Sequence, residues 1–227
     1  EVGYGGVIKT LTKGDIVKLD LGAHIEGHVT DTEITVEVGS NKHAKLLKAA
    51  SDALQAAIDV VKPGIKLCQI GAAVEDVIKS AGFNPIRNLS GHGVGMWIVH
   101  TAPTIPNFDN GDQTTLEEGQ HIAIEPFATD GEGFVKDGKP SGIFGLVNLK
   151  PVRLDSARRM IHFIQEEYRT LPFSARWVQH LQNANFVLRY LEKEGVLRQY
   201  PELPEKTGGL VSQKEHTLEV GKGVLTK

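Results

Sequence analysis

The sequence predicts an α+β fold built around antiparallel sheet. Residues 14–39 alternate apolar and polar side chains with period two, across a glycine-containing break at 24–27, which is typical of two strands joined by a tight turn. Two segments with helical periodicity follow, and strand-like segments then return. Turns this short cannot join parallel strands, so the order of elements favours α+β over a parallel α/β fold.

The elements follow from these patterns and from the residues that interrupt them. Asn41 is expected to cap a first helix that runs to about residue 61, where Pro63-Gly64 ends it. Gly82 is expected to end a second helix over 69–81, because a left-handed residue is favoured there. The remaining strands are expected at 87–99, 120–128, 142–147, 209–212 and 215–220. The remaining helices are expected at 156–168, 175–181 and 184–195.

Composition excludes several classes of protein. With 40% hydrophobic and 23% charged residues, the 227-residue chain is neither collagen-like nor disordered. The net charge of −3 gives no general support for nucleic-acid binding, so we expect no DNA partner. No apolar run approaches the ~18 residues of a membrane span, so we expect no membrane partner. The single cysteine, Cys68, excludes an intrachain disulfide and favours a cytoplasmic location.

Two aspartates are expected to face each other in the hairpin of residues 14–39. If the loop is symmetric, residues whose numbers add to 51 are cross-strand partners, and Asp20 lies opposite Asp31. A bulged loop would shift this register. Two carboxylates on one face repel, whereas two divalent ions ~3.5–4 Å apart would use both as ligands. Two exposed aspartates on a solvated face are the alternative interpretation.

Two histidines lie eight residues apart in SGHGVGMWIVH, residues 90–100. In an unbroken strand this even spacing would place His92 and His100 on one face. Glycines on both sides of His92 would let another backbone or a ligand approach closely. Imidazole suits Zn, Fe, Ni or Cu and titrates near neutrality, although a lone histidine is more often structural.

Two glutamates complete the set of candidate site residues. Glu125 lies within the apolar segment HIAIEPFATDGEG, and buried acids are rare unless they are paired or bound to a metal. Glu215 lies in the closing strand, in SQKEHTLEV, and is unremarkable by itself.

Taken together, these segments resemble one family. GDIVKLDLG…TDTEITVEVG, GHGVG…H, AIEPFATDGEG and GGLVSQKEHTLEV are similar, in this order, to segments of the type II methionine aminopeptidases of archaea and eukaryotes. The resemblance extends from about Lys13 to Val220. It includes a helical segment, KPVR…ARRMIHFIQEEYRTLPFSARW, that resembles the insert typical of type II.

The resemblance implies the pita-bread (creatinase/aminopeptidase) fold, an α+β fold with antiparallel sheet and an inserted helical subdomain. The catalytic domain would comprise residues 1–149 and 207–227, and the insert residues 150–206. The family has a further substrate-contacting histidine before its first metal aspartate, and the residues before Asp20 contain none. We therefore expect the N-terminal part of the fold to be missing from this sequence, which leaves activity of this chain in question.

The resemblance also implies two divalent metal ions and assigns their ligands. Asp31 and Glu215 match the bridging carboxylates, Asp20 serves one ion, and His92 and Glu125 serve the other. Four carboxylates and one imidazole suit Mn, Fe, Co or Zn, and the sequence does not choose among them.

The implied activity is removal of the N-terminal methionine from nascent proteins. A water activated by the two ions would attack the first peptide carbonyl, and Glu125 would pass a proton to the leaving amine. His100 matches a histidine that contacts the scissile amide and stabilises the tetrahedral intermediate. Phe127 or Ile143 would line an apolar pocket for the methionine side chain. The expected partners are N-terminal peptides of nascent proteins and, secondarily, the ribosome.

Two other functions remain open. One is an X-Pro-directed peptidase on the same fold, against which the helical insert argues. The other is a non-catalytic pita-bread protein that binds the ribosome or RNA. Four arginines could form a local basic patch for that role, or could lie on a solvated helix face: Arg153, Arg158, Arg159 and Arg169.

Overall fold

The computed structural model describes residues 10–226, and these residues divide into two compact units. The larger unit contains Leu11–Lys136 and the chain from Pro204 onward, and the smaller contains Asp137–Leu203 together with Thr10. The first nine residues of the segment predicted to be catalytic lie outside the described part. Within that part, no helix has the length and apolar character needed to cross a membrane.

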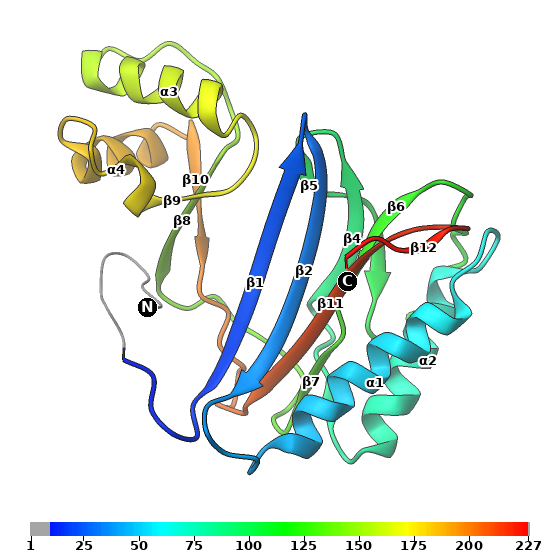
Figure 1. Ribbon diagram of the computed structural model, residues 1–227. Coiled ribbons are helices and arrows are strands. Elements are labelled where there is room, and N and C mark those ends of the chain that lie inside the picture. Colours follow the sequence, from blue (N-terminus) through cyan, green and yellow to red (C-terminus); the bar gives the residue numbers. More distant parts are fainter. Residues whose placement is uncertain (1–9, 227) are drawn as a thin grey trace. The chain divides into compact units, whose positions relative to one another are not determined.

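An antiparallel sheet forms the centre of the larger unit (Figure 1). Its main path runs in the order β1-β2-β11-β6-β4-β5, and β12, β7 and β3 extend it from β11. The strands are β1 Ile16–Ile25, β2 His28–Glu37, β3 Asn84–Pro85, β4 Ser90–Gly95, β5 Ile98–Pro106, β6 His121–Ile124, β7 Phe127–Thr129, β11 Val211–Glu219 and β12 Gly223–Val224. The α+β class with antiparallel sheet is confirmed.

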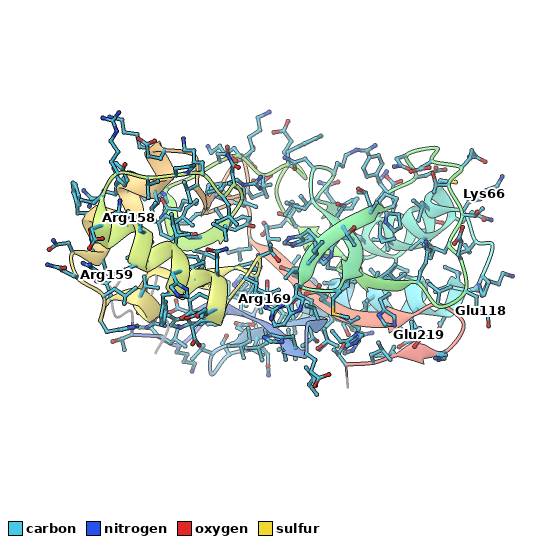
Figure 2. The ribbon with its side chains drawn as sticks, turned by 90° about the horizontal axis from the view of Figure 1, so that it is seen from above. Lys66, Glu118, Arg158, Arg159, Arg169 and Glu219 are labelled. Carbon is cyan, nitrogen blue, oxygen red and sulfur yellow. The ribbon has the colours of Figure 1, made fainter. Side chains whose placement is uncertain are left out.

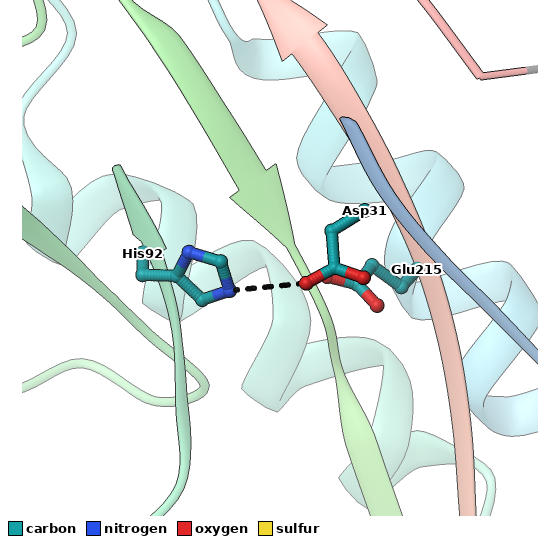
Figure 3. A group of neighbouring side chains, drawn as sticks. All are labelled: Asp31, His92 and Glu215. Atoms are coloured by element: carbon teal, nitrogen blue, oxygen red, sulfur yellow. Dashed lines mark ion pairs between the residues drawn. The ribbon is translucent and has the colours of Figure 1, made fainter. Parts of the chain in front are cut away.

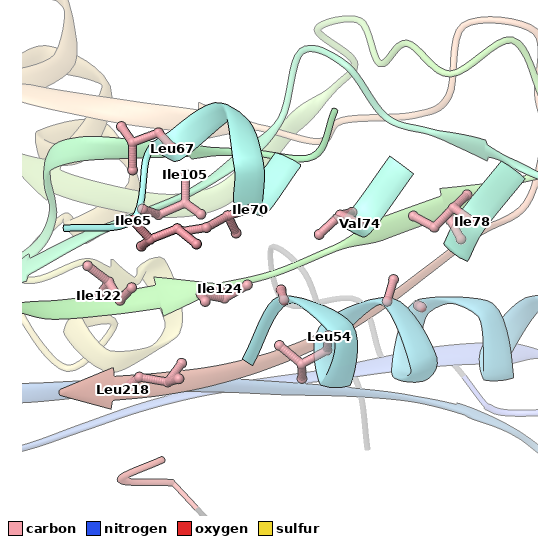
Figure 4. Close-up of a cluster of buried hydrophobic side chains, with 14 of the residues drawn as sticks. Leu54, Ile65, Leu67, Ile70, Val74, Ile78, Ile105, Ile122, Ile124 and Leu218 are labelled. Atoms are coloured by element: carbon pink, nitrogen blue, oxygen red, sulfur yellow. The ribbon is translucent and has the colours of Figure 1, made fainter. Parts of the chain in front are cut away.

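Two helices, α1 (Ala44–Val60) and α2 (Leu67–Ser80), lie beside each other against this sheet (Figure 1). They bury an apolar face against Ile122, Ile124 and Leu218 of the sheet, and Figure 4 shows this core. Gly82 follows α2 with a φ of +87°, as predicted for the residue that stops it. The apolar contacts lie on the helix side of the sheet, where β11 and β6 carry their buried leucine and isoleucines.

The β1–β2 register differs from the prediction. Ile25 pairs with His28, so partner numbers add to 53, Asp20 faces Glu33, and Asp31 faces Gly22. The loop is the two-residue turn Glu26-Gly27, and both residues have positive φ, as a tight hairpin turn of this kind requires. The predicted pairing of Asp20 with Asp31 was wrong by two residues. An even shift preserves the face, so both aspartates still point to the same side.

Other observed strand and helix boundaries also differ from the predicted ones. The expected strand at 87–99 is a hairpin, β4 and β5, which turns at Met96-Trp97, where Trp97 has a φ of +59°. The two strands expected at 209–220 are one strand, β11. Asn41 does not cap α1, because the Glu37 carboxylate accepts the backbone N–H groups of Lys42 and His43 instead, at 3.0 and 2.8 Å.

The smaller unit has its own sheet and core. Strands β8 (Pro140–Leu146), β9 (Phe173–Ser174) and β10 (Leu197–Pro201) pair in the order β10-β8-β9. The helices are α3 (Asp155–Glu167), the 3₁₀ turn η1 (Ala175–Val178) and α4 (Ala184–Lys193). The unit begins near residue 137, earlier than the expected 150, because β8 pairs with β9 and β10.

The arginines suggested as a basic patch are partly neutralised. Arg158 and Arg159 lie on α3, where Figure 2 shows them, and both form ion pairs with Asp155. Arg158 also donates to the carbonyl oxygens of Val152 and Arg153, at 3.1 and 2.8 Å. These contacts hold the start of the helix, and the single Asp155 carboxylate offsets one of the two positive charges.

A buried carboxylate joins two loops at one end of the larger unit. Glu205 is 4% exposed and accepts backbone N–H groups from Glu132, Gly133, Thr207 and Gly209. Burial alone would raise the pKa of Glu205, but hydrogen bonds from Thr207, Gly209 and Glu132 lower it to about 2. The ionised side chain therefore acts as an anchor between the two loops.

Replacing Glu205 by Gln should reduce the free energy of unfolding by about 2 kcal/mol, because the amide leaves part of this N–H array unpaired. Urea unfolding at pH 7 measures the loss. Glu132→Gln, an exposed substitution in the same loop, is the matched control and should change little. Equal stability of the two variants would show that the anchor contributes nothing.

Candidate metal centre

Four carboxylates form one row across neighbouring strands of the larger sheet. Asp20 on β1 pairs with Glu33 on β2, and Glu33 pairs with Glu215 on β11. Ile124 pairs with His216 and Phe127 with Gln213, so the same register on both sides of the β6–β7 break places Glu125 opposite Glu215. Cross-strand partners point to one face with Cβ atoms about 4.5–5.5 Å apart. The four acids are therefore immediate neighbours.

The interruption beside Glu125 has a simple cause. Pro126 has no backbone N–H and cannot continue the ladder with β11, so β6 ends at Ile124 and β7 begins at Phe127. The Glu125 side chain is held from the adjacent strand, because Gln213 Nε2 donates to its Oε2 at 3.0 Å. The other oxygen, Oε1, lies 3.6 Å from His92 Nε2.

Asp31 lies two residues before Glu33, on the same face of β2. Its backbone is fixed to β11, because Asp31 N–H donates to Thr217 Oγ1 and Thr217 Oγ1 donates to Asp31 O, both at 2.7 Å. Its side-chain Oδ2 is 4.0 Å from His92 Nε2. Thr217 thus fixes the position of the Asp31 backbone against β11.

His92 reaches the acids from β4, which runs between β5 and β6. The close packing of β4 against its neighbours requires glycine at positions 91 and 93. A Cβ atom at Gly91 would overlap the carbonyl oxygen of Ala123, and one at Gly93 would overlap that of Ala102. This is the close backbone approach that the glycine pattern predicted. His92 Nδ1 lies 3.0 Å from Gly93 O, and donation to that carbonyl leaves the Nε2 lone pair facing Asp31 and Glu125.

Three of the predicted ligands meet most closely. One ligand atom each from Asp31, His92 and Glu215 lies within 4.8 Å of the others. Figure 3 shows these three side chains pointing toward one another. Asp20 and Glu125 are the two ends of the row of acids that contains Glu215. The structure therefore brings all five predicted ligand residues to one face of one sheet, from β1, β2, β4, β11 and the β6–β7 junction.

The electrostatics of this face disfavour ionised carboxylates without a cation. Burial raises the pKa of Asp31 to about 7, with repulsion from Asp20 adding to it. Burial and repulsion from Glu125 and Asp31 raise the pKa of Glu215 to about 10. Burial likewise raises the pKa of Glu125, while it lowers the pKa of His92 and so disfavours the charged imidazolium. Desolvation also raises the pKa of Asp20, although its side chain retains contact with solvent.

Divalent cations fit this group of residues. Glu215 Oε1 is a buried carboxylate oxygen without a hydrogen-bond partner among the described residues, so the protein alone does not satisfy it. Carboxylate oxygens with a neutral, correctly oriented imidazole are the ligands that borderline-to-hard divalent ions accept. Such ions would remove the repulsion among the acids.

The metal-free chain should lose stability as the pH rises from 7 to 9. Asp31, Glu33 and Glu215 have folded-state pKa values of about 7, 8 and 10, above their ordinary values of 3.8 and 4.5. The folded state therefore holds protons that the unfolded chain has already released. The free energy of unfolding should consequently fall by about 1 kcal/mol or more for each pH unit. Urea unfolding in a chelator measures this decline. Stability that stays flat or increases over this range would contradict it.

The other two predicted site residues have different outcomes. His100 lies on β5 across the hairpin from His92, and the ring centroids are 4.4 Å apart in a T-shaped arrangement. The hairpin brings the rings together, whereas the unbroken strand that the spacing suggested does not exist. Phe127 is 6% exposed in a buried cluster with Ile86 and Val135, and its contact with substrate stays a prediction. Ile143 belongs to the smaller unit.

The sequence interpretation missed Glu33. This side chain is 1% exposed, lies in the row between Asp20 and Glu215, and has a pKa that burial raises to about 8. Its spacing of two residues from Asp31 was a signal that it shares the face of Asp31. The wrong register concealed its position opposite Asp20.

With this geometry established, comparison with known proteins identifies the family. Residues 4–165 match metallopeptidase family M24. The chain is 46% identical over 218 residues to the methionine aminopeptidase of Archaeoglobus fulgidus, covering 96% of this chain and 74% of that protein. The chain belongs to metallopeptidase family M24, among the methionine aminopeptidases. The M24 family implies divalent metal ions, in agreement with the donor set on the sheet face.

Solved structures support the fold of this M24 chain. A thermophilic Arx1 structure superposes with a TM-score of 0.80 at 19% identity, covering 95% of this chain and 67% of that one. Methionine aminopeptidase from Rickettsia prowazekii gives a TM-score of 0.63 at 24% identity, covering 95% and 64%. At these identities the likeness concerns the fold alone. The pita-bread fold that the sequence motifs implied is confirmed for this M24 member.

Proposed function

We propose that this M24 chain removes the N-terminal methionine from nascent proteins, with two divalent ions held by Asp20, Asp31, His92, Glu125 and Glu215. The observation that carries the proposal is the convergence of Asp31, His92 and Glu215 within 4.8 Å in a member of a metallopeptidase family. Each of these five side chains would supply ligand atoms to the ions. Mn, Fe, Co and Zn all suit these donors.

When bound, such ions supply the Lewis acidity that lowers the pKa of water and polarises a peptide carbonyl. Glu125 is proposed to move the proton from the attacking water to the leaving amine nitrogen. Its environment supports this role, because burial and neighbouring carboxylates raise its pKa well above the ordinary value. Gln213 holds one Glu125 oxygen at 3.0 Å and so fixes the direction of the other.

His100 is proposed to donate a ring N–H to the scissile carbonyl oxygen as negative charge develops on it. Contact with His92 at 4.4 Å between centroids places His100 beside the proposed ligands, and its exposure leaves it open to a peptide. Phe127 is proposed to contribute to the apolar pocket for the methionine side chain. The substrates would be N-terminal peptides of nascent proteins in the cytoplasm, near the ribosome that makes them.

Two alternatives make different predictions for the same assay. An X-Pro-directed peptidase would release the first residue of an X-Pro peptide, and a non-catalytic ribosome- or RNA-binding protein would cleave neither peptide. The retained set of four acids and one histidine favours catalysis over the second alternative.

The test combines metal analysis of the purified protein with hydrolysis of Met-Ala-Ser and of an X-Pro peptide, using the chain with any sequence that precedes it in the natural protein. Release of methionine from Met-Ala-Ser in the presence of Mn²⁺ or Co²⁺, and its loss with a chelator, would support the proposal. Bound metal without release of methionine would contradict it.

A further inference from the structure

We propose that Glu33 is a sixth cation-binding residue of this centre and makes the Asp20 side an all-carboxylate subsite, at which Mn²⁺ binding depends on Glu33 more strongly than Zn²⁺ binding does. This inference rests on the proposed metal binding at the same face. Glu33 is not among the five metal ligands that the sequence motifs indicated.

The position of Glu33 is the first argument. Asp20 and Glu215, both proposed ligands, are its direct cross-strand partners on β1 and β11. Asp31 is two residues away on the same face of β2. Glu33 therefore lies at the centre of the proposed ligands, with its Cβ atom ~5 Å from those of its two cross-strand partners.

The unsatisfied oxygens are the second argument. Glu33 Oε2 and Glu215 Oε1 are both buried without a hydrogen-bond partner among the described residues, and they belong to residues that directly face each other. Glu33 Oε1 lies 3.2 Å from the Thr35 hydroxyl, whose proton it shares with Gln213 O at 2.7 Å. Glu33 Oε2 is therefore the oxygen that we expect to meet a cation. A buried carboxylate oxygen with no partner is costly, and a cation shared with Glu215 would satisfy both oxygens.

The charge balance is the third argument. The five proposed ligands carry four carboxylates, which two divalent ions neutralise, and ionised Glu33 adds one further negative charge. Lys18 lies on the same face of β1 and is attracted to Glu33, Asp20 and Glu125. Its ammonium group offsets the charge that Glu33 adds. The five carboxylates, Lys18 and two divalent ions together therefore carry no net charge.

The ligand chemistry gives the expected preference. His92 belongs to the other side of the centre, so Asp20, Glu33, Asp31 and Glu215 offer only carboxylate oxygens to the ion on the Asp20 side. Oxygen-only donor sets suit Mn²⁺, whereas imidazole is the donor that suits Zn²⁺. Removing Glu33 should therefore weaken Mn²⁺ binding more than Zn²⁺ binding.

The experiment compares Mn²⁺ and Zn²⁺ titrations of the wild type, Glu33→Gln and Glu26→Gln, followed by calorimetry and, for Mn²⁺, by its EPR signal. Gln at position 33 keeps the acceptor for Thr35 and removes the charge. Glu26→Gln removes a charge from the exposed turn of the same hairpin. We expect Glu33→Gln to raise the Mn²⁺ dissociation constant at one site by ~10-fold or more, with a Zn²⁺ change below ~3-fold, and Glu26→Gln to match the wild type.

Each other result overturns the proposal. Unchanged or tighter Mn²⁺ binding in Glu33→Gln would show that Glu33 is no ligand, and equal losses for Mn²⁺ and Zn²⁺ would exclude an all-carboxylate subsite. If Glu33→Gln does not fold, Glu33→Asp replaces it, because its retracted carboxylate should also weaken Mn²⁺ binding. A wild type that binds neither ion would reject the proposed function itself, whereas a wild type that binds both leaves that function intact whatever Glu33 does.

Discussion

Asp31→Asn is expected to abolish tight binding of at least one divalent ion, with a loss of affinity of ~100-fold or more. The substitution removes the charge from a carboxylate proposed to contact both ions, 4.0 Å from His92 Nε2. The backbone of residue 31 should stay in place, because both of its hydrogen bonds to Thr217 Oγ1 use main-chain atoms. Calorimetric titration with Mn²⁺ or Co²⁺ and metal analysis measure the effect.

The matched control for this variant is Asp52→Asn on α1. Asp52 is exposed and pairs with Lys48 in the preceding turn, so the same change of charge should leave metal binding unaltered. The amide that Asp31→Asn introduces resembles the protonated Asp31 that the raised pKa favours near neutrality, so the metal-free fold should retain its stability. Unchanged metal stoichiometry in Asp31→Asn would count against the dinuclear proposal.

His100→Ala is expected to lower kcat by ~10²–10³ while metal content stays the same. That range is the usual cost of losing one donor to a developing oxyanion. The proposed ligand His92 should keep its orientation, because its Nδ1 remains 3.0 Å from Gly93 O. Steady-state kinetics with a Met-peptide and metal analysis of the same sample separate catalysis from metal binding.

Two further variants sharpen this test. His162→Ala removes an exposed histidine of α3 that contacts Glu166, and should leave kcat unchanged. His100→Gln keeps a side-chain N–H donor and should recover part of the lost rate. A rate in His100→Ala equal to that of the wild type would remove this residue from the mechanism, and loss of metal would assign it a structural role instead.

The local patterns predicted elements better than register. Period-two alternation located β1 and β2, because a half-buried strand must alternate its side chains. The pairing of Asp20 with Asp31 failed because the alternation does not reveal which two residues form the turn, and Glu26-Gly27 took that place. The predicted register was wrong by two residues, an even number, so both aspartates stayed on the face of the site. The consequence was that the position of Glu33 opposite Asp20 was missed.

The two histidines illustrate the opposite case. Their even spacing suggested one continuous strand, but the chain turns at Met96-Trp97 and returns as β5. The rings meet across the hairpin, 4.4 Å apart, and not along a strand. The two histidines were thus correctly expected to lie close together, but for the wrong reason. Spacing alone does not show where a strand reverses.

The sequence by itself determined the α+β class, the family and the chemical types of the site residues, since these depend on local periodicity and on motifs that are contiguous in the chain. Only the tertiary structure decided that Asp20, Glu33, Glu215 and Glu125 form one row, because β2 and β6 pair with a strand that follows them by about 90 residues or more. Pairing between distant segments depends on the packing of the whole sheet, and no local pattern encodes it.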